Sequence, residues 1–562
     1  MSASPIHCDP DFGESVLQTL RPAAPTWPLG IEEDRTALAF GHGMLRMGVE
    51  RAPALLPAAR ELLLWNWQRR PLSLDALTPL LEAGRTQPFT PPLPRFLRKL
   101  HAALARPLDS EPLRAAMDAG EQALALKHLL LRVRQPGEGI FWLAASWDWL
   151  LRLGREDLPP SLLDAADVEP DLLPLKNRLR AEWALHYLPP KQALAHAQAL
   201  SPELWSPFSD YLRAELPLRM DERAEGIRLL AGVWRRLPWH PQLTLKLSNL
   251  LEPPVPASDE DYSDTCVLVY SWNKAELLEQ TLRSLAASDL RRALVVALDN
   301  GSSDATAETV RRCRSLFAPG RFLDVRLPVN VGAPAARNWL LSLPEVRACR
   351  RAAFLDDDVL LPADWLVRLG RAMDESGADV AGCRIISASA PACIQSADYH
   401  LLPPGQCPST FQEREDNILI FDNCANALDL GLFSYRRPAL SVSGCCHLLS
   451  MEGVRRAGDF DIRFSPTQFD DLERDLRVGL NGMKVVYEGR LAVRHVQHSS
   501  LAKAQTLAGI GHVFGNRIKL EGKYGREEIK ALGDRHRETL WTDLLARRKA
   551  LLQGLPPQTC EE

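Results

Sequence analysis

The chain has 562 residues, with 46% hydrophobic and 25% charged side chains and a formal net charge of −4. This length exceeds what one hydrophobic core supports, so two or three domains are expected. The slightly acidic balance gives no reason to expect a nucleic-acid-binding protein. The first twenty residues lack a basic segment followed by an apolar core, and the most apolar stretch, 140–153, contains Asp148 and Arg152. Neither a secretory signal nor a transmembrane segment is therefore predicted.

The eleven cysteines are scattered, and no CxxC pair indicates a zinc site. A disulfide framework is not expected in a chain of this length, so reduced thiols and a cytoplasmic location are predicted. A peripheral position at the inner face of a membrane stays open. The adjacent Cys445 and Cys446 are interpreted as small buried residues rather than nucleophiles.

Residues 1–251 are predicted to form an all-helical domain. The segments 121–133, 192–200 and 225–237 have apolar residues at helical spacing, and prolines separate them. This pattern is typical of short helices paired antiparallel. The many tryptophans of this half are expected to lie mostly in its core.

Residues 193–251 resemble a tetratricopeptide-type helical repeat, with an Ala-rich helix, a helix containing Trp234 and a Pro-terminated turn. The resemblance implies a concave surface that binds a protein partner or a protein acceptor. A helical packing domain without any ligand is the alternative, and both interpretations stay open.

The pattern changes after a linker at 252–263, which is rich in proline and acidic residues. Apolar β-branched segments then alternate with amphipathic ones. Strands are predicted at 266–270, 294–298, 322–327 and 351–355, and helices at 274–286, 305–317 and 333–343. This alternation predicts an α/β domain with a parallel sheet, in which ligands bind beyond the carboxyl ends of the strands.

Polar side chains follow each of these four strands. In chain order they are Ser271 and Asn273, then Asp299 and Asn300, then Asn330, Gly332 and Arg337, and finally Asp356, Asp357 and Asp358. Asp299 can accept hydrogen bonds from a base or a ribose, and a glycine beside a helix start suits a phosphate. Arg337 either contacts the bound ligand or forms a salt bridge within the fold. Together these segments predict one ligand site at the strand ends.

The aspartate triplet 356–358 lies between two apolar runs, which predicts a buried strand that ends in an acidic tip. Three neighbouring carboxylates repel one another unless a positive charge lies among them. A divalent cation that carries a phosphorylated ligand is the natural candidate, because hard cations prefer carboxylate oxygen. An isolated triplet of this kind is more often a solvated acidic turn, but its position after three similar strand ends favours the metal site.

These segments, in this order, resemble the inverting glycosyltransferases of family 2, which have a GT-A fold. The resemblance rests on 267–273, 299–304, 330–338 and 354–358, and on a second block at 444–450, 458–464, 469–477 and 494–498. It covers about 264–500, under half of the chain. It implies a nucleotide-diphosphate sugar as donor, a hydroxyl of a glycan or protein as acceptor, and Mn²⁺ or Mg²⁺ as cofactor.

The resemblance also implies roles for individual residues. Donor binding falls to Ser271, Asn273, Asp299, Asn300, Asn330, Gly332, Arg337, Asp356 and Asp357, and metal binding to Asp358, Asp356 and His495, with His498 as a reserve ligand. Asp471 is the expected general base and Asp470 the alternative. The family commonly has Gly and Glu-Asp where this chain has Phe469 and Asp470-Asp471, so which of the two carboxylates reaches the acceptor stays open.

Two further segments are expected around this domain. Residues 385–442 exceed a simple connection in length and are interpreted as an insertion that shapes the acceptor site, or as a lid. Residues 501–562 are predicted to form a helical extension with charges of both signs, which does not support a basic membrane face. The competing functions are a nucleotidyltransferase and a catalytically silent adaptor that binds partners through its helical domain.

Overall fold

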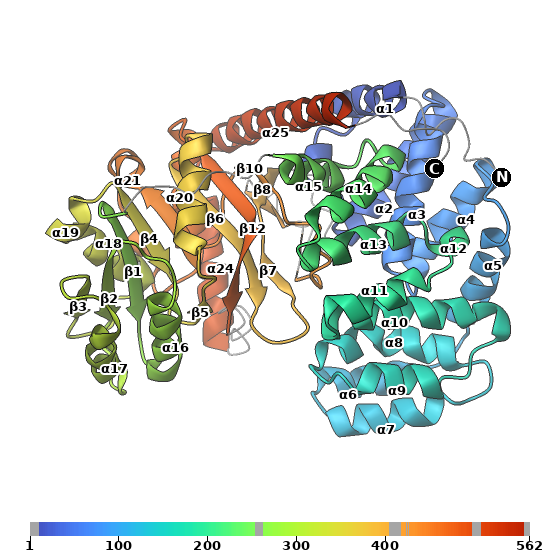
Figure 1. The fold of residues 1–562 in the computed structure, drawn as a ribbon, viewed down its shortest axis with the longest axis horizontal. Coiled ribbons are helices and arrows are strands. Elements are labelled where there is room, and N and C mark those ends of the chain that lie inside the picture. Colours follow the sequence, from blue (N-terminus) through green and yellow to red (C-terminus); the bar gives the residue numbers. More distant parts are fainter. Residues whose placement is uncertain are drawn as a thin grey trace. The chain divides into compact units, whose positions relative to one another are not determined.

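The computed structural model describes residues 10–252, 262–403, 418–422, 424, 426–496 and 507–555 (Figure 1). The chain divides into two compact units. The first comprises Met1–Trp27, Ile31–Leu251 and Arg548–Glu562, and the second comprises Pro28–Gly30 and Glu252–Arg547. Most of the predicted linker lies outside the described residues, as does His498.

The first unit is helical, as predicted. Its helices are α1 (Pro10–Ala23), α2 (Asp34–Glu50), α3 (Leu55–Arg69), α4 (Leu74–Thr86), α5 (Leu93–Leu104), α6 (Glu111–Asp118), α7 (Gln122–Arg132), α8 (Gly139–Arg152), α9 (Leu158–Ala165), α10 (Leu173–Tyr187), α11 (Pro190–Gln198), α12 (Pro202–Trp205), α13 (Phe208–Arg219), α14 (Arg223–Arg236) and α15 (Pro241–Leu251). Neighbours in sequence pack as pairs, for example α2 with α3 and α13 with α14. The tetratricopeptide resemblance stays a prediction.

Tryptophans form much of the core of the first unit. The buried ones are Trp27, Trp65, Trp67, Trp142, Trp147, Trp205, Trp234 and Trp239. The rings of Trp67 and Trp205 are stacked with centroids 5.2 Å apart. The expectation that most tryptophans of this half are core residues is confirmed, because large aromatic rings contribute most when they are removed from water.

The second unit alternates strands and helices up to α20 and continues with further strands. Its elements are β1 (Thr265–Ser271), α16 (Ala275–Ala286), β2 (Leu294–Asp299), α17 (Thr306–Cys313), β3 (Phe322–Arg326), α18 (Ala333–Ser342), α19 (Pro344–Arg347), β4 (Arg351–Leu355), β5 (Val359–Leu360), α20 (Trp365–Ser376), β6 (Val380–Ser387), β7 (Ile394–Ser396), β8 (Tyr399–Leu402), β9 (Leu419–Asp422), β10 (Arg436–Ala439), β11 (Cys446–Ser450), α21 (Met451–Ala457), α22 (Asp470–Leu480), β12 (Val485–His495), α24 (Leu507–Glu521) and α25 (Arg526–Gly554). The last helix continues into the first unit.

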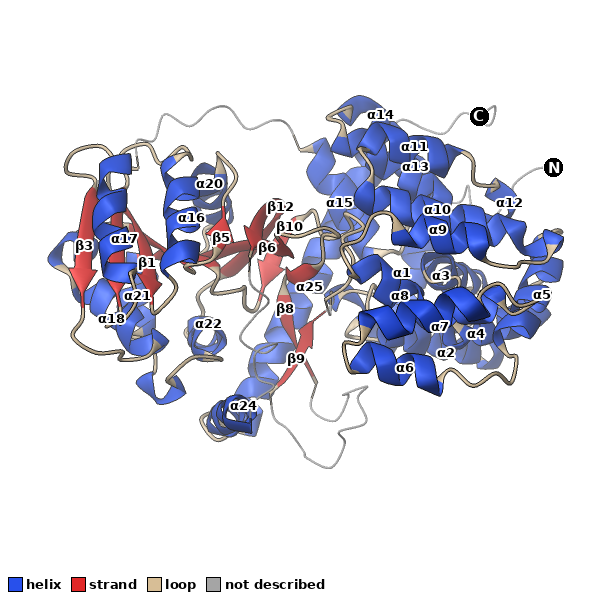
Figure 2. Cartoon of the chain, turned by 90° about the horizontal axis from the view of Figure 1, so that it is seen from below, coloured by secondary structure: helices blue, strands red, loops and turns tan. Residues whose placement is uncertain are grey.

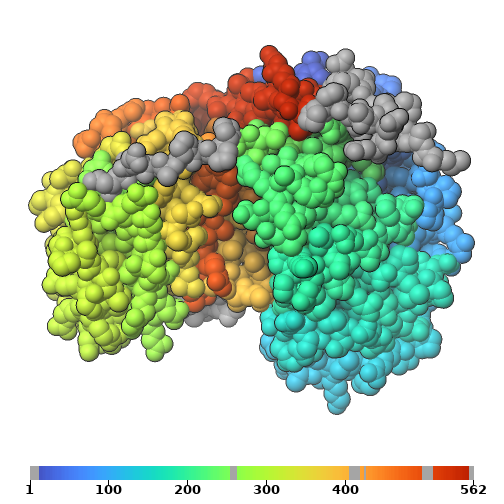
Figure 3. Space-filling view, in the orientation of Figure 1, coloured from blue at the N-terminus to red at the C-terminus, as the bar shows by residue number. Residues whose placement is uncertain are grey.

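The main sheet has the strand order β10-β12-β6-β11-β4-β1-β2-β3. The strands β4, β1, β2 and β3 are mutually parallel, while β11 runs antiparallel between β4 and β6. Helices α16, α17 and α20 pack on one face, and α18, α21 and α22 lie on the other (Figure 2). The yellow-green part of the chain forms a continuous surface of the second unit in the space-filling view (Figure 3). The predicted α/β class with a mostly parallel sheet is confirmed, and the carboxyl ends of β1, β2 and β4 share one edge.

The segment 385–442 is partly built into this sheet. Strand β7 pairs with β6, and β10 pairs with β12 at the sheet edge, while β8 and β9 form a separate two-stranded sheet. Residues 404–417, which include the Pro-Gly and acidic stretches, lie outside the described residues. The roles in acceptor shaping or as a lid stay predictions.

The helical extension after β12 packs against the second unit. Leu520 of α24 and Ile529 and Leu532 of α25 are buried in one apolar cluster with Phe464 and Leu476. Throughout the described ranges, none of the helices combines the length and apolar character needed to cross a membrane.

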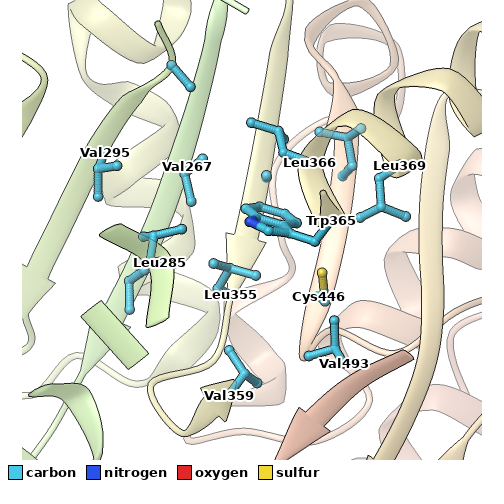
Figure 4. Close-up of a cluster of buried hydrophobic side chains, with 14 of the residues drawn as sticks. Val267, Leu285, Val295, Leu355, Val359, Trp365, Leu366, Leu369, Cys446 and Val493 are labelled. Atoms are coloured by element: carbon cyan, nitrogen blue, oxygen red, sulfur yellow. The ribbon is translucent and has the colours of Figure 1, made fainter. Parts of the chain in front are cut away.

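Trp365 lies in the core between the sheet and the helices α16, α17 and α20. Its side chain is fully buried against Leu355, Leu366 and Cys446 (Figure 4), and its indole Nε1 donates to Ser288 Oγ at 3.1 Å. We expect Trp365→Ala to lower the free energy of unfolding by about 3–5 kcal/mol, because the truncation removes buried apolar surface and leaves a cavity in the core. Calorimetric melting of the full chain measures this.

The matched control is Trp339→Ala. Trp339 of α18 is 50% exposed, so the same truncation there removes little buried area and should leave the melting temperature nearly unchanged. Equal shifts for the two variants would show that Trp365 is not a central core residue.

Candidate functional site

The strand ends are tied together by short hydrogen bonds. Ser271 ends β1 opposite Asp299 of β2, and its Oγ donates to Asp357 Oδ2 at 2.6 Å. The backbone N–H of Asn300 donates to Ser271 O at 2.9 Å. Three segments that are distant in sequence therefore meet at this edge, as the sequence predicted for parallel strands.

The three predicted asparagines shape the loops above this edge. Asn273 has a φ of 52°, and its Oδ1 accepts from Ser303 N at 2.8 Å. Asn300 Nδ2 donates to Asn330 Oδ1 at 3.0 Å, and the same oxygen accepts from Gly332 N at 2.9 Å. Their amide groups thus form hydrogen bonds with neighbouring loop groups, and their role in donor binding stays a prediction.

Gly301 allows its own loop and the loop at Val329 and Asn330 to lie close together. It has a φ of +71°, and a Cβ there would lie 2.3 Å from the carbonyl carbon of Val329. Any side chain would push the loops apart, so glycine is required for both conformation and space.

The two carboxylate oxygens of Asp299 differ in their contacts. The side chain is 1% exposed, and its Oδ1 accepts from Ser302 N at 2.9 Å. Its Oδ2 lies 3.2 Å from Arg326 Nε but has no hydrogen-bond partner among the described residues. A buried carboxylate oxygen without a hydrogen bond is costly, and an N–H or O–H of a bound molecule would satisfy it.

Two carboxylates of the triplet share a lysine. Lys274 Nζ donates to Asp357 Oδ1 at 2.8 Å and to Asp358 Oδ2 at 3.0 Å. Burial keeps the pKa of Asp357 above its ordinary value although Lys274 acts in the opposite direction. The sequence predicts a positive charge among these carboxylates, and in the structure Lys274, which directly follows Asn273, supplies one.

His495 ends β12 and faces Asp358. Its Nε2 lies 2.8 Å from Asp358 Oδ1, and its Nδ1 lies 2.6 Å from Gln395 Oε1. Burial alone would lower the pKa of His495, but the hydrogen bond and charge of Asp358 outweigh it and raise that pKa above its usual value. Burial would likewise raise the pKa of Asp358, and His495 together with Lys274 holds it below the usual value.

In the part of the chain that the structure describes, one trio of metal-ligand side chains comes together. It consists of Asp356, Cys445 and His495, whose donor atoms lie within 4.8 Å of one another. Burial and the charge of Asp356 raise the pKa of the Cys445 thiol well above its ordinary value. The predicted ligands Asp356 and His495 thus meet, whereas Asp358 lies between His495 and Lys274. The sequence around Cys445 does not distinguish a metal ligand from a packing residue, and its place beside Asp356 follows from the pairing of β11 with β4.

Arg337 forms a buried ion pair behind the triplet. Its Nη1 donates to Asp470 Oδ2 at 2.8 Å, and its Nη2 is 3.9 Å from Asp356 Oδ1. The guanidinium also lies over the rings of Phe354 and Phe460, with its Cζ 5.8 Å and 5.2 Å from the ring centroids. Burial raises the pKa of Asp470 to about 6, although Arg337 acts in the opposite direction. Of the two interpretations left open for Arg337, the structure contains the salt bridge within the fold.

Asp471 is the less buried member of the acidic pair. It lies in the first turn of α22, and its Oδ2 accepts from Gly444 N at 2.9 Å. Asp470 is 3% exposed and paired with Arg337, whereas Asp471 is half-buried. Asp471 is therefore the more accessible carboxylate of the pair.

Gly444 leaves room for the side chains of Asp471 and Arg337. A Cβ at this position would lie 2.8 Å from Asp471 Oδ2 and 2.9 Å from Arg337 Nη2. We expect Gly444→Ala to displace the carboxylate and to reduce turnover by about 10²-fold, the scale of a misplacement near 1 Å. Steady-state assays with a substrate that the parent chain turns over measure the effect. Gly515→Ala, which has open space around its new methyl group, should keep full activity, and full activity of both variants would contradict this role of Gly444.

Comparison with known proteins identifies a family for part of the second unit. Residues 266–426 match the model described as "Glycosyl transferase family 2". The second unit contains a family 2 glycosyltransferase domain. The predicted family and the GT-A fold class are confirmed for this part of the chain. No curated protein matches the chain.

Solved structures with a resemblance to the chain are remote. A structure of GalNAc-T7 with UDP, GalNAc and Mn²⁺ is 12% identical, with a TM-score of 0.35 over 53% of this chain and 60% of that one. S. aureus TarS is 16% identical, with a TM-score of 0.31 over 50% of this chain and 43% of that one. A Pyrobaculum calidifontis mannosyltransferase with GDP-Man and Mn²⁺ is 16% identical, with a TM-score of 0.32 over 61% and 85%. The chain thus spans less than two thirds of the first two proteins, and nothing about its sugar or acceptor follows from them.

Proposed function

We propose that the protein transfers a sugar from a nucleotide-diphosphate sugar to a hydroxyl of a protein or glycan acceptor, with inversion at the anomeric carbon and with a divalent cation. The observation that carries the proposal is the arrangement of acidic groups in the family 2 domain. The triplet 356–358, the pair Asp470 and Asp471, and His495 all lie at one edge of the sheet. Such a site combines a place for a charged leaving group with a base for an acceptor.

The residues present fit a divalent cation. Asp356 and His495 reach a common point together with Cys445, and Asp358 lies beside His495. Carboxylate and imidazole groups are suitable ligands for Mn²⁺, and carboxylates for Mg²⁺. Asp356, Asp358 and His495 would hold the ion, which would offset the charge that develops on the diphosphate as it leaves.

Asp471 is proposed to act as the general base. A base must reach the acceptor hydroxyl by a hydrogen bond, and the half-buried Asp471 can do so while Asp470 is held by Arg337. Asp471 would take the hydroxyl proton as the acceptor oxygen attacks the anomeric carbon in line with the departing diphosphate. A single in-line displacement inverts that carbon.

The buried Asp299 Oδ2 is proposed to accept a hydrogen bond from the donor nucleoside. Asp299 lies at the end of β2, beside Ser271, where a nucleotide binds in sheets of this type. The first unit stays the predicted binding domain for a protein partner or acceptor, and the cytoplasmic location stays a prediction.

The deciding experiment is donor hydrolysis. Purified protein would be incubated with Mn²⁺ and a panel of UDP-, GDP- and dTDP-sugars, and released nucleoside diphosphate would be measured. We expect release from one donor, and loss of that release with EDTA and in Asp358→Ala. Asp289→Ala, which removes a surface partner of Arg291, is the control variant and should behave like the parent chain.

An enzyme that needs its acceptor would release no nucleoside diphosphate from any donor in this assay. Binding of each donor is therefore measured by calorimetry as well. Neither release nor binding of any donor would reject the proposal and favour the silent adaptor.

A further inference from the structure

We propose that Cys445 is a metal ligand, so that the cation binds to a mixed site of carboxylate, imidazole and thiolate formed by Asp356, His495 and Cys445. This inference rests on the proposed function, because it concerns the ion of the same site. A thiolate ligand favours borderline ions such as Zn²⁺ and Co²⁺, whereas Mg²⁺ prefers oxygen ligands. The site would therefore select its ion through a residue outside the aspartate triplet.

The backbone holds Cys445 next to Asp356. Strand β11 is antiparallel to β4, and Cys446 pairs with Leu355. Cys445 and Asp356 are the next residues along the two strands, and Asp356 N donates to Cys445 O at 3.1 Å. Because the two side chains come from hydrogen-bonded neighbours, their proximity is built into the sheet rather than into a loop.

A hydrogen bond to Gln395 orients the imidazole of His495. Its Nδ1 is 2.6 Å from Gln395 Oε1, and Gln395 is in β7, which pairs with β6. A metal-binding histidine commonly donates its second N–H to such an acceptor, which leaves the other nitrogen for the ion. That nitrogen, Nε2, lies 2.8 Å from Asp358 Oδ1, so the bound ion would replace this contact. Gln395 thus acts as a positioning residue for His495.

Charge also singles out Asp356. Lys274 forms ion pairs with both Asp357 and Asp358, at 2.8 Å and 3.0 Å. The ion pair between Asp356 and Arg337 is longer, at 3.9 Å. Asp356 is therefore the carboxylate of the triplet whose charge is least compensated, and it is the one that lies beside the thiol and the imidazole.

The alternative role for Cys445 is packing, since it also contacts the apolar core of the second unit. Zn²⁺ binds more tightly than Mg²⁺ to most sites with nitrogen and oxygen ligands. The order of metal affinities therefore does not separate the two roles, and the test must detect the metal–sulfur bond.

The experiment is Co²⁺ titration of the full chain, stripped of metal and kept reduced under anaerobic conditions. A Co²⁺–thiolate bond gives an intense charge-transfer absorption in the near ultraviolet, which carboxylate and imidazole ligands do not produce. We expect this band at one equivalent of Co²⁺ in the parent chain and its loss in Cys445→Ser and Cys445→Ala. The affinity for Zn²⁺, measured by competition with a chelator, should fall by at least about tenfold in both variants.

Cys446→Ala is the matched control, because Cys446 is the neighbouring cysteine and is fully buried. It should keep the band. Circular dichroism and melting temperature show whether each variant is folded, and Cys445→Ser preserves side-chain volume if Cys445→Ala does not fold.

Co²⁺ binding without the band, a band that persists in folded Cys445→Ser, or no Co²⁺ binding would each overturn the inference. The measurement uses no donor and no acceptor. Failure of sugar transfer with the band present would therefore count against the proposed function only, and transfer without the band would count against the cysteine ligand only.

Discussion

Replacement of Asp471 by asparagine is expected to reduce the rate of sugar transfer by about 10²–10⁴-fold, the usual contribution of a positioned general base. Asparagine has nearly the same shape and still accepts the hydrogen bond that Gly444 N donates to Asp471 Oδ2 at 2.9 Å, but it cannot take a proton. The melting temperature and the donor affinity should therefore stay close to those of the parent chain, while kcat falls. Single-turnover transfer and calorimetric donor binding measure the two effects separately.

Asp470→Asn is the comparison that separates the two carboxylates. Asp470 is buried and pairs with Arg337, so its replacement should lower the melting temperature, which Asp471→Asn should not do. Unchanged kcat in Asp471→Asn together with a large loss in folded Asp470→Asn would assign the base to Asp470 instead.

The second large effect is expected for Arg337→Met. Removal of one partner of a buried ion pair leaves the other charge uncompensated and typically costs about 3–5 kcal/mol of stability. Here the carboxylate of Asp470 would lose its 2.8 Å partner while it remains buried beside Asp471. Chemical denaturation of the full chain, followed by a probe of the second unit, measures the loss.

The double variant Arg337→Met/Asp470→Leu tests whether the pair is structural. Replacement of both charges by apolar groups of similar size is often neutral or stabilising, so most of the lost stability should return. If transfer returns as well, Arg337 acts only within the fold. A stable double variant without transfer would instead assign Arg337 or Asp470 a contact with substrate, as the sequence first left open for Arg337.

The sequence was informative about this site wherever the function follows from position along a strand. Asp299 and Asp356 each follow an apolar β-branched or aromatic segment, and parallel strands must present those ends at one edge. Ser271 and Asp299 are indeed register partners. The same logic placed Asn273, Asn300 and Asn330 near the ligand, but it could not show that their amides are used by neighbouring loops.

Contacts between strands and helices that are distant in the chain were not predictable in this way. Lys274 looked like a helix start, yet it neutralises two carboxylates more than eighty residues away. Gln395 lies in a segment interpreted as an insertion, yet it contacts His495. Such partners depend on how side chains pack in three dimensions, and neither periodicity nor spacing encodes that packing.

The sequence by itself determined the helical first half, the α/β second half and the edge of the sheet at which the acidic residues gather, because apolar periodicity and strand order are local properties of a chain. Only the tertiary structure decided which charged groups neutralise one another. It paired Arg337 with Asp470 and Lys274 with Asp357 and Asp358. It also placed the thiol of Cys445 beside Asp356 and His495. The physical reason is that ion pairs and metal-ligand sets depend on distances of a few ångströms between side chains, and these distances are set only when the sheet and both of its helical layers are packed.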